Sequence, residues 1–265
     1  MTDHADLLAR LERYYDDAPR AGADTEEHGP FTVFVSRGGW PYYARPRLGH
    51  TGEITADDVS SVLDRLEELG VPRSIEWVHD TTPSLRAAAR AAGVEVGDYP
   101  LLVLASEPVH RRSPATVRRL AGDDPELASV QAAVHVGFGQ DDTRTGPASV
   151  AERDALVAEQ QTEHVAHLLA SGRSVLYGAF DPELGAVGGG SHNPRGDVTE
   201  IVGVGVLPAY RRRGLAAAIT ARLARHALDN GVRTVFCSAQ DDAVAHVYES
   251  VGFRRVGTAC VAEAE

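Results

Sequence analysis

One order of elements occurs twice in this chain, and it constrains the fold more than any single motif does. Residues 66–105 and residues 227–262 each contain a helix, a glycine, a strand, a polar turn, a second helix, a second glycine and a strand. Such an internal repeat predicts two related halves. Because strands alternate with helices in both copies, the repeat also predicts a mixed α/β sheet.

The N-terminal half is expected to be a small α/β domain. Leu7, Leu8 and Leu11 follow helical spacing, and Thr55 and Gly70 are good helix-end residues. We expect helices over 3–17, 55–70 and 83–93, and strands over 31–36, 42–47, 74–78 and 99–106. Residues 107–114 are polar, contain two prolines and favour a linker. The sequence therefore predicts one domain over 1–112 and a second over 113–265.

The C-terminal half repeats the pattern on a larger scale. We expect helices over 126–138, 150–172, 215–231 and 243–252, and strands over 115–121, 174–180, 185–192, 198–206, 234–240 and 255–262. Residues 181–184, DPEL, predict a hairpin between two of these strands. The helix over 150–172 is expected to be continuous up to Gly172.

Composition limits the partners and the compartment. The formal net charge of −12 argues against nucleic-acid binding and favours cationic or neutral substrates. Cys237 and Cys260 lack the spacing of metal ligands, so we expect free thiols and no metal. No apolar stretch approaches the roughly 18 residues of a membrane span. These features predict a cytoplasmic protein that binds neither nucleic acid nor membrane.

A basic turn stands out in this acidic chain. An apolar strand over 198–206 leads into Arg211, Arg212, Arg213 and Gly214, and an alanine-rich helix follows at once. The first turn of a helix leaves backbone N–H groups unpaired, and a glycine there allows phosphate oxygens to approach the main chain. The alternative is a solvated basic turn that binds nothing.

Residues 211–216 resemble the R/Q-x-x-G-x-G/A signature of the GNAT superfamily, the acyl-CoA-dependent N-acyltransferases. Residues 247–253 resemble the L-Y-x-x-x-G-F segment of that family, and Val204 and Val206 match its V-x-V strand. The resemblance covers roughly the C-terminal 150 residues. It implies a mostly antiparallel GNAT sheet flanked by helices, acetyl-CoA as co-substrate and a small-molecule amine as acceptor. The N-terminal half is then a reduced GNAT-like copy without its own CoA site.

The resemblance also implies roles for individual residues. Glu200 is the expected base, directly or through a water, and Tyr248 is the expected acid that protonates the CoA thiolate. Without catalysis, Glu200 is a surface carboxylate at a strand end and Tyr248 is a core aromatic. The expected CoA contacts come from the strand over 198–206, from the basic turn with its arginine side chains and the start of the helix after it, and from the entrance of the helix over 243–252. These residues are Val204, Val206, Arg211, Arg212, Arg213, Gly214, Leu215, Ala216 and Asp241. The family often has an asparagine where Asp241 stands.

Two histidines are weaker candidates. His164 lies on one face of the expected helix over 150–172, and His192 follows a run of glycines on the hairpin that flanks the acceptor site in relatives. Either histidine could contact the substrate, and either could equally be a packed or solvated residue. A non-catalytic acyl-CoA sensor or scaffold is the alternative function, and a homodimer is possible.

Overall fold

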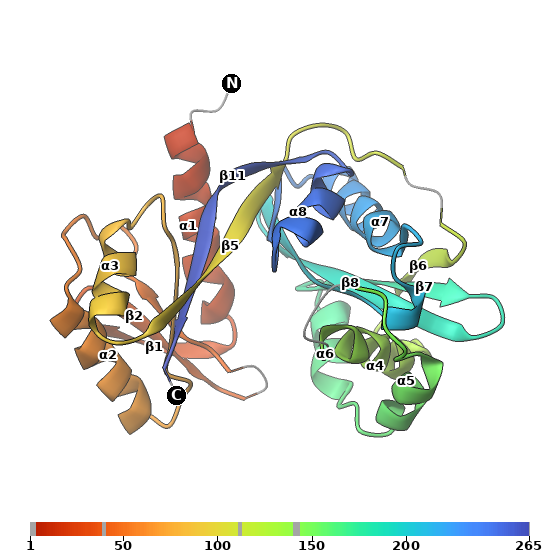
Figure 1. Ribbon diagram of the computed structural model, residues 1–265, viewed down its shortest axis with the longest axis horizontal. Coiled ribbons are helices and arrows are strands. Elements are labelled where there is room, and N and C mark those ends of the chain that lie inside the picture. The colour runs from red at the N-terminus through yellow and green to blue at the C-terminus, as the bar shows by residue number, and fades with distance from the viewer. Residues whose placement is uncertain (1–3, 39–40, 111–112, 140–143, 265) are drawn as a thin grey trace. The chain divides into compact units, whose positions relative to one another are not determined.

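A computed structural model describes residues 4–38, 41–110, 113–139 and 144–264 of this protein (Figure 1). The chain divides into two compact units, described here separately. Unit 1 comprises Met1–Leu101 and Val256–Glu265, and unit 2 comprises Leu102–Arg255. Residues 111–112, where the sequence predicts the domain boundary, lie outside the described residues. The final strand thus belongs largely to unit 1, although the sequence assigns it to the second domain.

Unit 1 is an α/β layer built mainly from the N-terminal half. Its helices are α1 (His4–Arg20), α2 (Ala56–Glu68) and α3 (Ser84–Ala91), and its strands are β1 (Ala23–His28), β2 (Phe31–Ser36), β3 (Ala44–Pro46), β4 (Ser74–Val78) and parts of β5 (Glu95–Leu104) and β11 (Phe253–Glu263). The strand order is β1-β2-β3-β4-β11-β5. All the elements predicted for this half are present, and the sequence analysis missed only the short charged strand β1.

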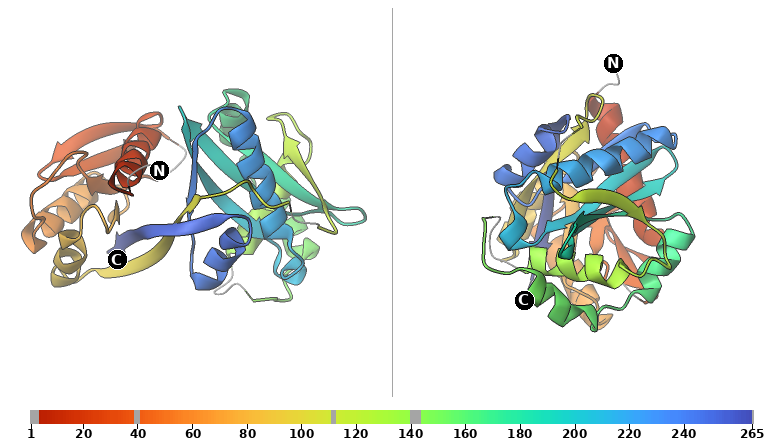
Figure 2. Two further views of the ribbon diagram at one scale, coloured as in Figure 1. Left: turned by 90° about the horizontal axis from the view of Figure 1, so that it is seen from above. Right: turned by 90° about the vertical axis from the view of Figure 1, so that its right-hand side faces the viewer.

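The last strand of the chain completes the sheet of unit 1. Residues 259–263 of β11 pair antiparallel with residues 74–78 of β4. The Cys260 thiol donates a hydrogen bond of 3.2 Å to Asp98 of β5, and Arg86 of α3 reaches the same carboxylate at 2.7 Å. Figures 1 and 2 show β11 beside β5. β11 therefore lies between β4 and β5 in the sheet.

Two different kinds of packing cover the faces of the unit 1 sheet. On one face, apolar side chains of α2 and α3 pack against the strands, with Trp77 the largest buried side chain. On the other face, α1 covers the buried Arg45, whose guanidinium lies 4.3 Å from the ring centre of Tyr15 and 3.3 Å from Glu12. Burial raises the pKa of nearby Glu76 to about 7, because the charged carboxylate loses hydration.

The strands of unit 2 follow the order β10-β9-β8-β7-β6, and most neighbouring pairs are antiparallel. Its strands are β6 (Thr116–Leu120), β7 (Val175–Asp181), β8 (Gly185–Arg195), β9 (Val198–Val206) and β10 (Thr234–Ser238), and its helices are α4 (Leu127–Phe138), α5 (Val150–Val157), α6 (Glu163–Ala170), α7 (Leu215–Asp229) and α8 (Asp242–Glu249). The predicted fold class, a mixed and mostly antiparallel sheet with flanking helices, is confirmed.

Helices cover both faces of the unit 2 sheet. In Figure 1, α7 and α8 lie on one side of the strands and α4, α5 and α6 on the other. Two successive glycines of β8 show how closely the helices approach: a Cβ at Gly189 would lie 2.5 Å from Val130 of α4, and one at Gly190 would lie 3.1 Å from Ile219 of α7. Any larger residue would push a helix away from the sheet.

The predicted continuous helix over 150–172 is wrong. The structure divides this segment into α5 and α6, and residues 158–162 between them are not helical. The side chain of Gln160 donates to the carbonyl of Leu156, and Thr162 precedes the first turn of α6. Because no glycine or proline marks the break, helical propensity alone favoured one long helix.

Candidate active site

Two parallel strands separate in the middle of unit 2. The pairing of β9 with β10 joins Val198 to Thr234, Thr199 to Val235, and Glu200 to Phe236. Among the described residues, no further register pair joins these strands, while β9 continues to Val206 along β8. The strands therefore diverge after Glu200, and the separation opens the sheet between its two helical layers.

A bulge in β9 follows the point of separation. Between the pairs Ser191–Val202 and Gly189–Gly205, β9 contains one more residue than β8, and Gly203 has a positive φ of +63°. A β-bulge leaves backbone groups outside the ladder and redirects the following side chains. Val204 consequently points to the α7 side, where a Cβ at Gly190 would lie 2.9 Å from its methyl group.

The basic turn forms an open helix N-terminus. Arg212 has a φ of +63°, rare for a residue with a side chain, and Gly214 has a φ of +78° and forms the N-cap of α7. The Gly214 position carries no side-chain cap, so the first N–H groups of α7 remain available to an external acceptor. The α7 macrodipole and these N–H groups together favour an anion such as a pyrophosphate.

The Arg211 side chain donates to main-chain carbonyl groups of three segments. Its guanidinium donates hydrogen bonds of 2.6 Å to the carbonyl of Gly137, 2.8 Å to that of Arg144 and 3.4 Å to that of Val206. These bonds join the basic turn to the C-terminal end of α4 and to the end of β9. The sequence predicted that this side chain holds a phosphate, whereas the structure shows it bonded to the main chain.

A cavity of about 560 Å³ fills the separation between β9 and β10. Residues from both sheet faces line it, among them Gly137 and Phe138 of α4 on one side and Val244, Val247 and Tyr248 of α8 on the other. Of the residues predicted from the sequence, the lining includes Val204, Val206, Arg211, Arg212, Gly214, Leu215, Ala216 and Tyr248. The cavity therefore connects the α7 N-terminus with the phenol of Tyr248.

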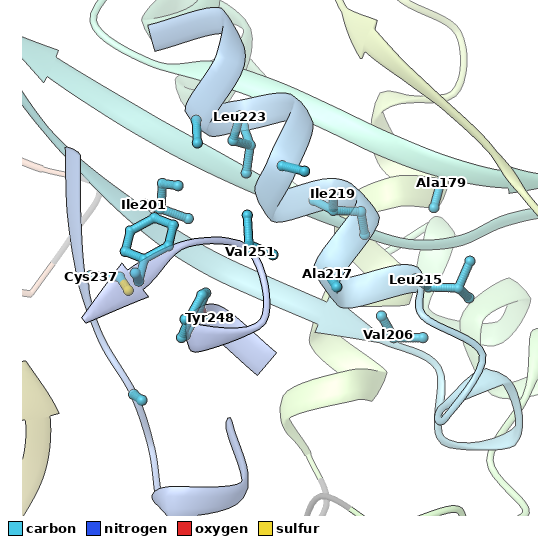
Figure 3. Packing of buried hydrophobic residues seen from close by; sticks show 14 of the residues in the cluster. Ala179, Ile201, Val206, Leu215, Ala217, Ile219, Leu223, Cys237, Tyr248 and Val251 are labelled. Carbon is cyan, nitrogen blue, oxygen red and sulfur yellow. The ribbon is translucent and has the colours of Figure 1, made fainter. Parts of the chain in front are cut away.

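Tyr248 of α8 is one of the residues that line this cavity. Its side chain is buried beside Cys237 of β10 and Ile201 of β9, as Figure 3 shows. Burial, and after it the neighbouring Cys237 and Glu200, hold the pKa of Tyr248 far above its usual range. The phenol therefore keeps its proton at neutral pH and is a hydrogen donor in the cavity lining.

Glu200 occupies the last paired position of β9 before the separation. It is half-buried, and the next residue along the strand, Ile201, lines the cavity. Its negative charge contributes to the raised pKa values of both Cys237 and Tyr248, after burial as the main cause. Glu200 thus directly precedes, along β9, the first strand residue that lines the cavity.

Glu200 and the remaining predicted site residues are not part of the cavity lining. Asp241 caps α8 by accepting a 2.8 Å hydrogen bond from the Val244 amide, and Arg213 lies 4.8 Å from the ring centre of Tyr210. His164 is exposed on α6. His192 is buried and 3.0 Å from both Thr199 and His226 of α7. The structure places His192 in the core.

The corresponding helix end of unit 1 is already filled by its own side chains. Thr55 caps α2, and Asp58 accepts a 2.9 Å hydrogen bond from the Thr55 amide and one of 2.7 Å from its hydroxyl. These bonds lower the pKa of Asp58, because they favour the charged carboxylate. A carboxylate thus occupies the α2 terminus, whereas the α7 terminus has no such group.

Several lining residues were not predicted from the sequence. Gly137 allows α4 to approach β9, since a Cβ there would lie 3.0 Å from the Val206 nitrogen. Ser238, Gln240 and His246 also line the cavity. Only Gly137, a glycine near the end of a predicted helix, carried a local signal.

The described part of the chain has neither a cluster of metal-ligating side chains nor a helix that could cross a membrane. No group of three or more histidine, cysteine, aspartate or glutamate side chains in the described part of the chain could hold a metal ion. In the same ranges, every helix is too short or too polar to cross a membrane.

Comparisons with known proteins agree with this geometry. Residues 142–253 match the model of the Acetyltransferase (GNAT) family. A GCN5-related N-acetyltransferase from Kribbella flavida has a similar structure, with a TM-score of 0.71 and 16% sequence identity over 97% of this chain and 96% of that one. A tandem GNAT protein from the clavulanic acid biosynthesis pathway matches with a TM-score of 0.57 and 13% identity over 89% of this chain and 78% of that one.

A third solved structure, a GCN5-related N-acetyltransferase from Sphaerobacter thermophilus, has a TM-score of 0.55 and 16% identity over 97% of this chain and 84% of that one. The comparison with curated proteins found no match. At these identities the structural likeness shows the fold, which is the GNAT fold in a tandem arrangement. The family match and the fold suggest acyl transfer from acyl-CoA.

Proposed function

Because the chain has the GNAT fold in a tandem arrangement, we propose that unit 2 transfers an acetyl group from acetyl-CoA to the amine of a small-molecule acceptor. One observation carries this proposal above all others. A single cavity is lined by both the open N-terminus of α7 and Tyr248, and Glu200 directly precedes the lining residue Ile201 on β9. A phosphate-bearing thioester needs an anion site at one end and a proton donor at the other.

The α7 end supplies the anion site. The uncapped N–H groups that follow Gly214 bind the pyrophosphate, and the positive φ of Arg212 turns the main chain toward it. The guanidinium of Arg211 holds this turn against the ends of α4 and β9. Acetyl-CoA supplies an activated acyl group, and the chain itself binds, orients and exchanges protons.

Glu200 removes the proton that blocks attack. An alkylammonium with a pKa of about 10.4 must lose a proton at pH 7, which costs about 4–5 kcal/mol. The carboxylate of Glu200, directly or through one water, accepts this proton, so that the nitrogen lone pair can form the new C–N bond as the C–S bond breaks. The proton then leaves Glu200 for solvent, and the second proton, which the nitrogen loses as the amide forms, leaves by the same route.

Tyr248 supplies the proton for the leaving sulfur. Its buried phenol keeps its proton at neutral pH, as its raised pKa requires, and it lies in the cavity lining. The phenol donates to the sulfur as the C–S bond breaks, which prevents a bare thiolate from forming in an apolar pocket. Its phenolate then recovers a proton from solvent as the products leave.

Thiol release from acetyl-CoA with a panel of amines tests this proposal. Tyr248→Phe should lower kcat about a hundredfold without weakening acetyl-CoA binding. Tyr177→Phe, the same change on β7 of unit 2, should leave kcat within about twofold of the wild type. Glu200→Gln should lower kcat and remove the ascending limb of its pH dependence at acidic pH, where the carboxylate loses its proton. If the wild type binds acetyl-CoA but releases no thiol with any amine, a sensor or scaffold replaces the enzyme.

A further inference from the structure

Four side chains beside the separation of β9 and β10 share one face of the unit 2 sheet. His192 contacts His226 of α7, so His192 and its register partner Ile201 face the α7 side. Because side chains alternate along a strand, the residues next to His192 on β8 and next to Ile201 on β9 face the opposite side of the sheet. These neighbours pair as Ser191 with Val202 and Asn193 with Glu200. We call these four residues the β8–β9 row.

The β8–β9 row adjoins the cavity and remains accessible. All four of its side chains are half-buried. Helix α4 approaches the same face at the glycine positions farther along the strands, where a Cβ at Gly189 or Gly205 would contact Val134. Val202 lines the cavity, and Glu200 lies two residues before it on the same face. Of the row, Val202 is a lining residue, and Ser191, Asn193 and Glu200 lie beside it on the face opposite α7.

The chemistry of the row suits a cationic molecule with more than one polar group. Asn193 and Glu200 are directly opposite each other, so their Cβ atoms are about 5 Å apart. They present an amide and a carboxylate, with the hydroxyl of Ser191 one pair farther along. Arg195, next on this face, donates to the carbonyls of Arg173 at 3.1 Å and Pro194 at 2.7 Å. Its charge is thus held by main-chain carbonyl groups.

We propose that Asn193 is a specificity residue, which binds a hydroxyl or second amino group of the acceptor while Glu200 faces the reacting nitrogen. This inference rests on the proposed acetyl transfer. The spacing across the strand pair suits an amine whose second polar group is on the neighbouring carbon atom. The acceptor class is therefore an amino alcohol, an amino sugar or a polyamine.

The same geometry disfavours acceptors that carry a carboxylate beside the amine. Such a group would lie next to the Glu200 carboxylate, and two like charges at close range repel each other. The amide oxygen of Asn193 could accept a hydrogen bond from a hydroxyl or ammonium group without this repulsion. Amino acids are therefore expected to be poor acceptors.

A matched pair of amines tests the role of Asn193. The probes are 1-amino-2-propanol and isobutylamine, which differ by a hydroxyl in place of a methyl group. The wild type should prefer the amino alcohol about tenfold in kcat/KM, the value of one hydrogen bond to a well-placed polar group. Asn193→Ala should reduce this preference to about one, mainly through KM, without changing acetyl-CoA affinity.

Two further variants guard against a purely structural effect. Asn193→Leu keeps the size of the side chain and should also lose the preference for the amino alcohol. Asn230→Ala makes the same truncation as Asn193→Ala, but at the end of α7, and should keep that preference. An unchanged preference in the Asn193 variants, or no preference in the wild type, overturns this inference and leaves the acetyl transfer standing. A wild type that releases no thiol with any amine overturns the acetyl transfer itself, and the inference with it.

Discussion

Replacing Arg211 with alanine tests the view that this side chain supports the basic turn from behind. The substitution removes hydrogen bonds of 2.6 and 2.8 Å to the carbonyls of Gly137 and Arg144, and a weaker one of 3.4 Å to that of Val206. A hydrogen bond from a charged group contributes about 1.5–3 kcal/mol. The bond to Arg144 is exposed and contributes little, because solvent competes for it. We therefore expect the substitution to lower the unfolding free energy of unit 2 by about 2–3 kcal/mol.

The loss should be visible before any ligand is added. In urea unfolding of the ligand-free protein, the transition of unit 2 should move to lower denaturant, and acetyl-CoA affinity should fall about tenfold because the turn is no longer held. Arg213→Ala is the matched control, since its guanidinium stacks over Tyr210 at an exposed position and contributes about 0.5–1 kcal/mol.

The two possible roles of Arg211 give different results. If its side chain contacted a phosphate and nothing else, Arg211→Ala would weaken acetyl-CoA binding while leaving the ligand-free protein as stable as the wild type. That result would refute the reasoning, because the three carbonyl bonds would then contribute nothing.

Three further perturbations test the two units separately. Glu76, half-buried with a pKa of about 7, should make unit 1 about 2 kcal/mol less stable as the pH rises from 4.5 through 7, and Glu76→Gln should remove this slope in urea titrations. His192, whose pKa is lowered to about 4 by burial and then by His226 and Arg119, should make unit 2 about 3 kcal/mol less stable as the pH falls from 6.5 to 4, and His192→Asn should flatten that dependence. Deleting residues 256–265 should unfold unit 1 while unit 2 stays folded, because the sheet loses the strand that lies between β4 and β5, and limited proteolysis should then cut within residues 4–101.

Each of these expectations can fail in a specific way. The sign for Glu76 follows from a folded pKa above the unfolded one, and the sign for His192 follows from a folded pKa below it. A slope that survives Glu76→Gln or His192→Asn would assign the titration to another group. Protection of residues 4–101 after the deletion would show that β11 does not hold unit 1 together.

The local elements could be predicted from the sequence because their signals are local. The helix α7 follows a glycine cap, and the strand β9 ends in the apolar, glycine-containing stretch over 201–206, so the open helix end next to a strand was predictable. Tyr248 was found in the same way, through its fixed distance from the glycine that ends α8. These residues depend on spacing within one segment of chain.

The long-range features were not predictable in this way. The alternation of apolar and polar residues in β11 does not predict that this strand pairs with β4, because many strands could pair with the same pattern. The guanidinium of Arg211 crosses to Gly137, 74 residues earlier, and no periodicity encodes such a contact. The opposition of Asn193 and Glu200 likewise depends on the register of two strands, which the turn at residues 196–197 sets only once it has formed.

The central claim is that the cavity between β9 and β10 binds acetyl-CoA and that the carboxylate-filled end of α2 does not. Titration calorimetry of the full chain with acetyl-CoA measures this directly. We expect one acetyl-CoA to bind per chain. Gly214→Val should abolish this binding, because it forces a side chain into a positive φ of +78°, and Asp58→Ala should retain it. Two sites per chain, or a single site that survives Gly214→Val, would contradict it.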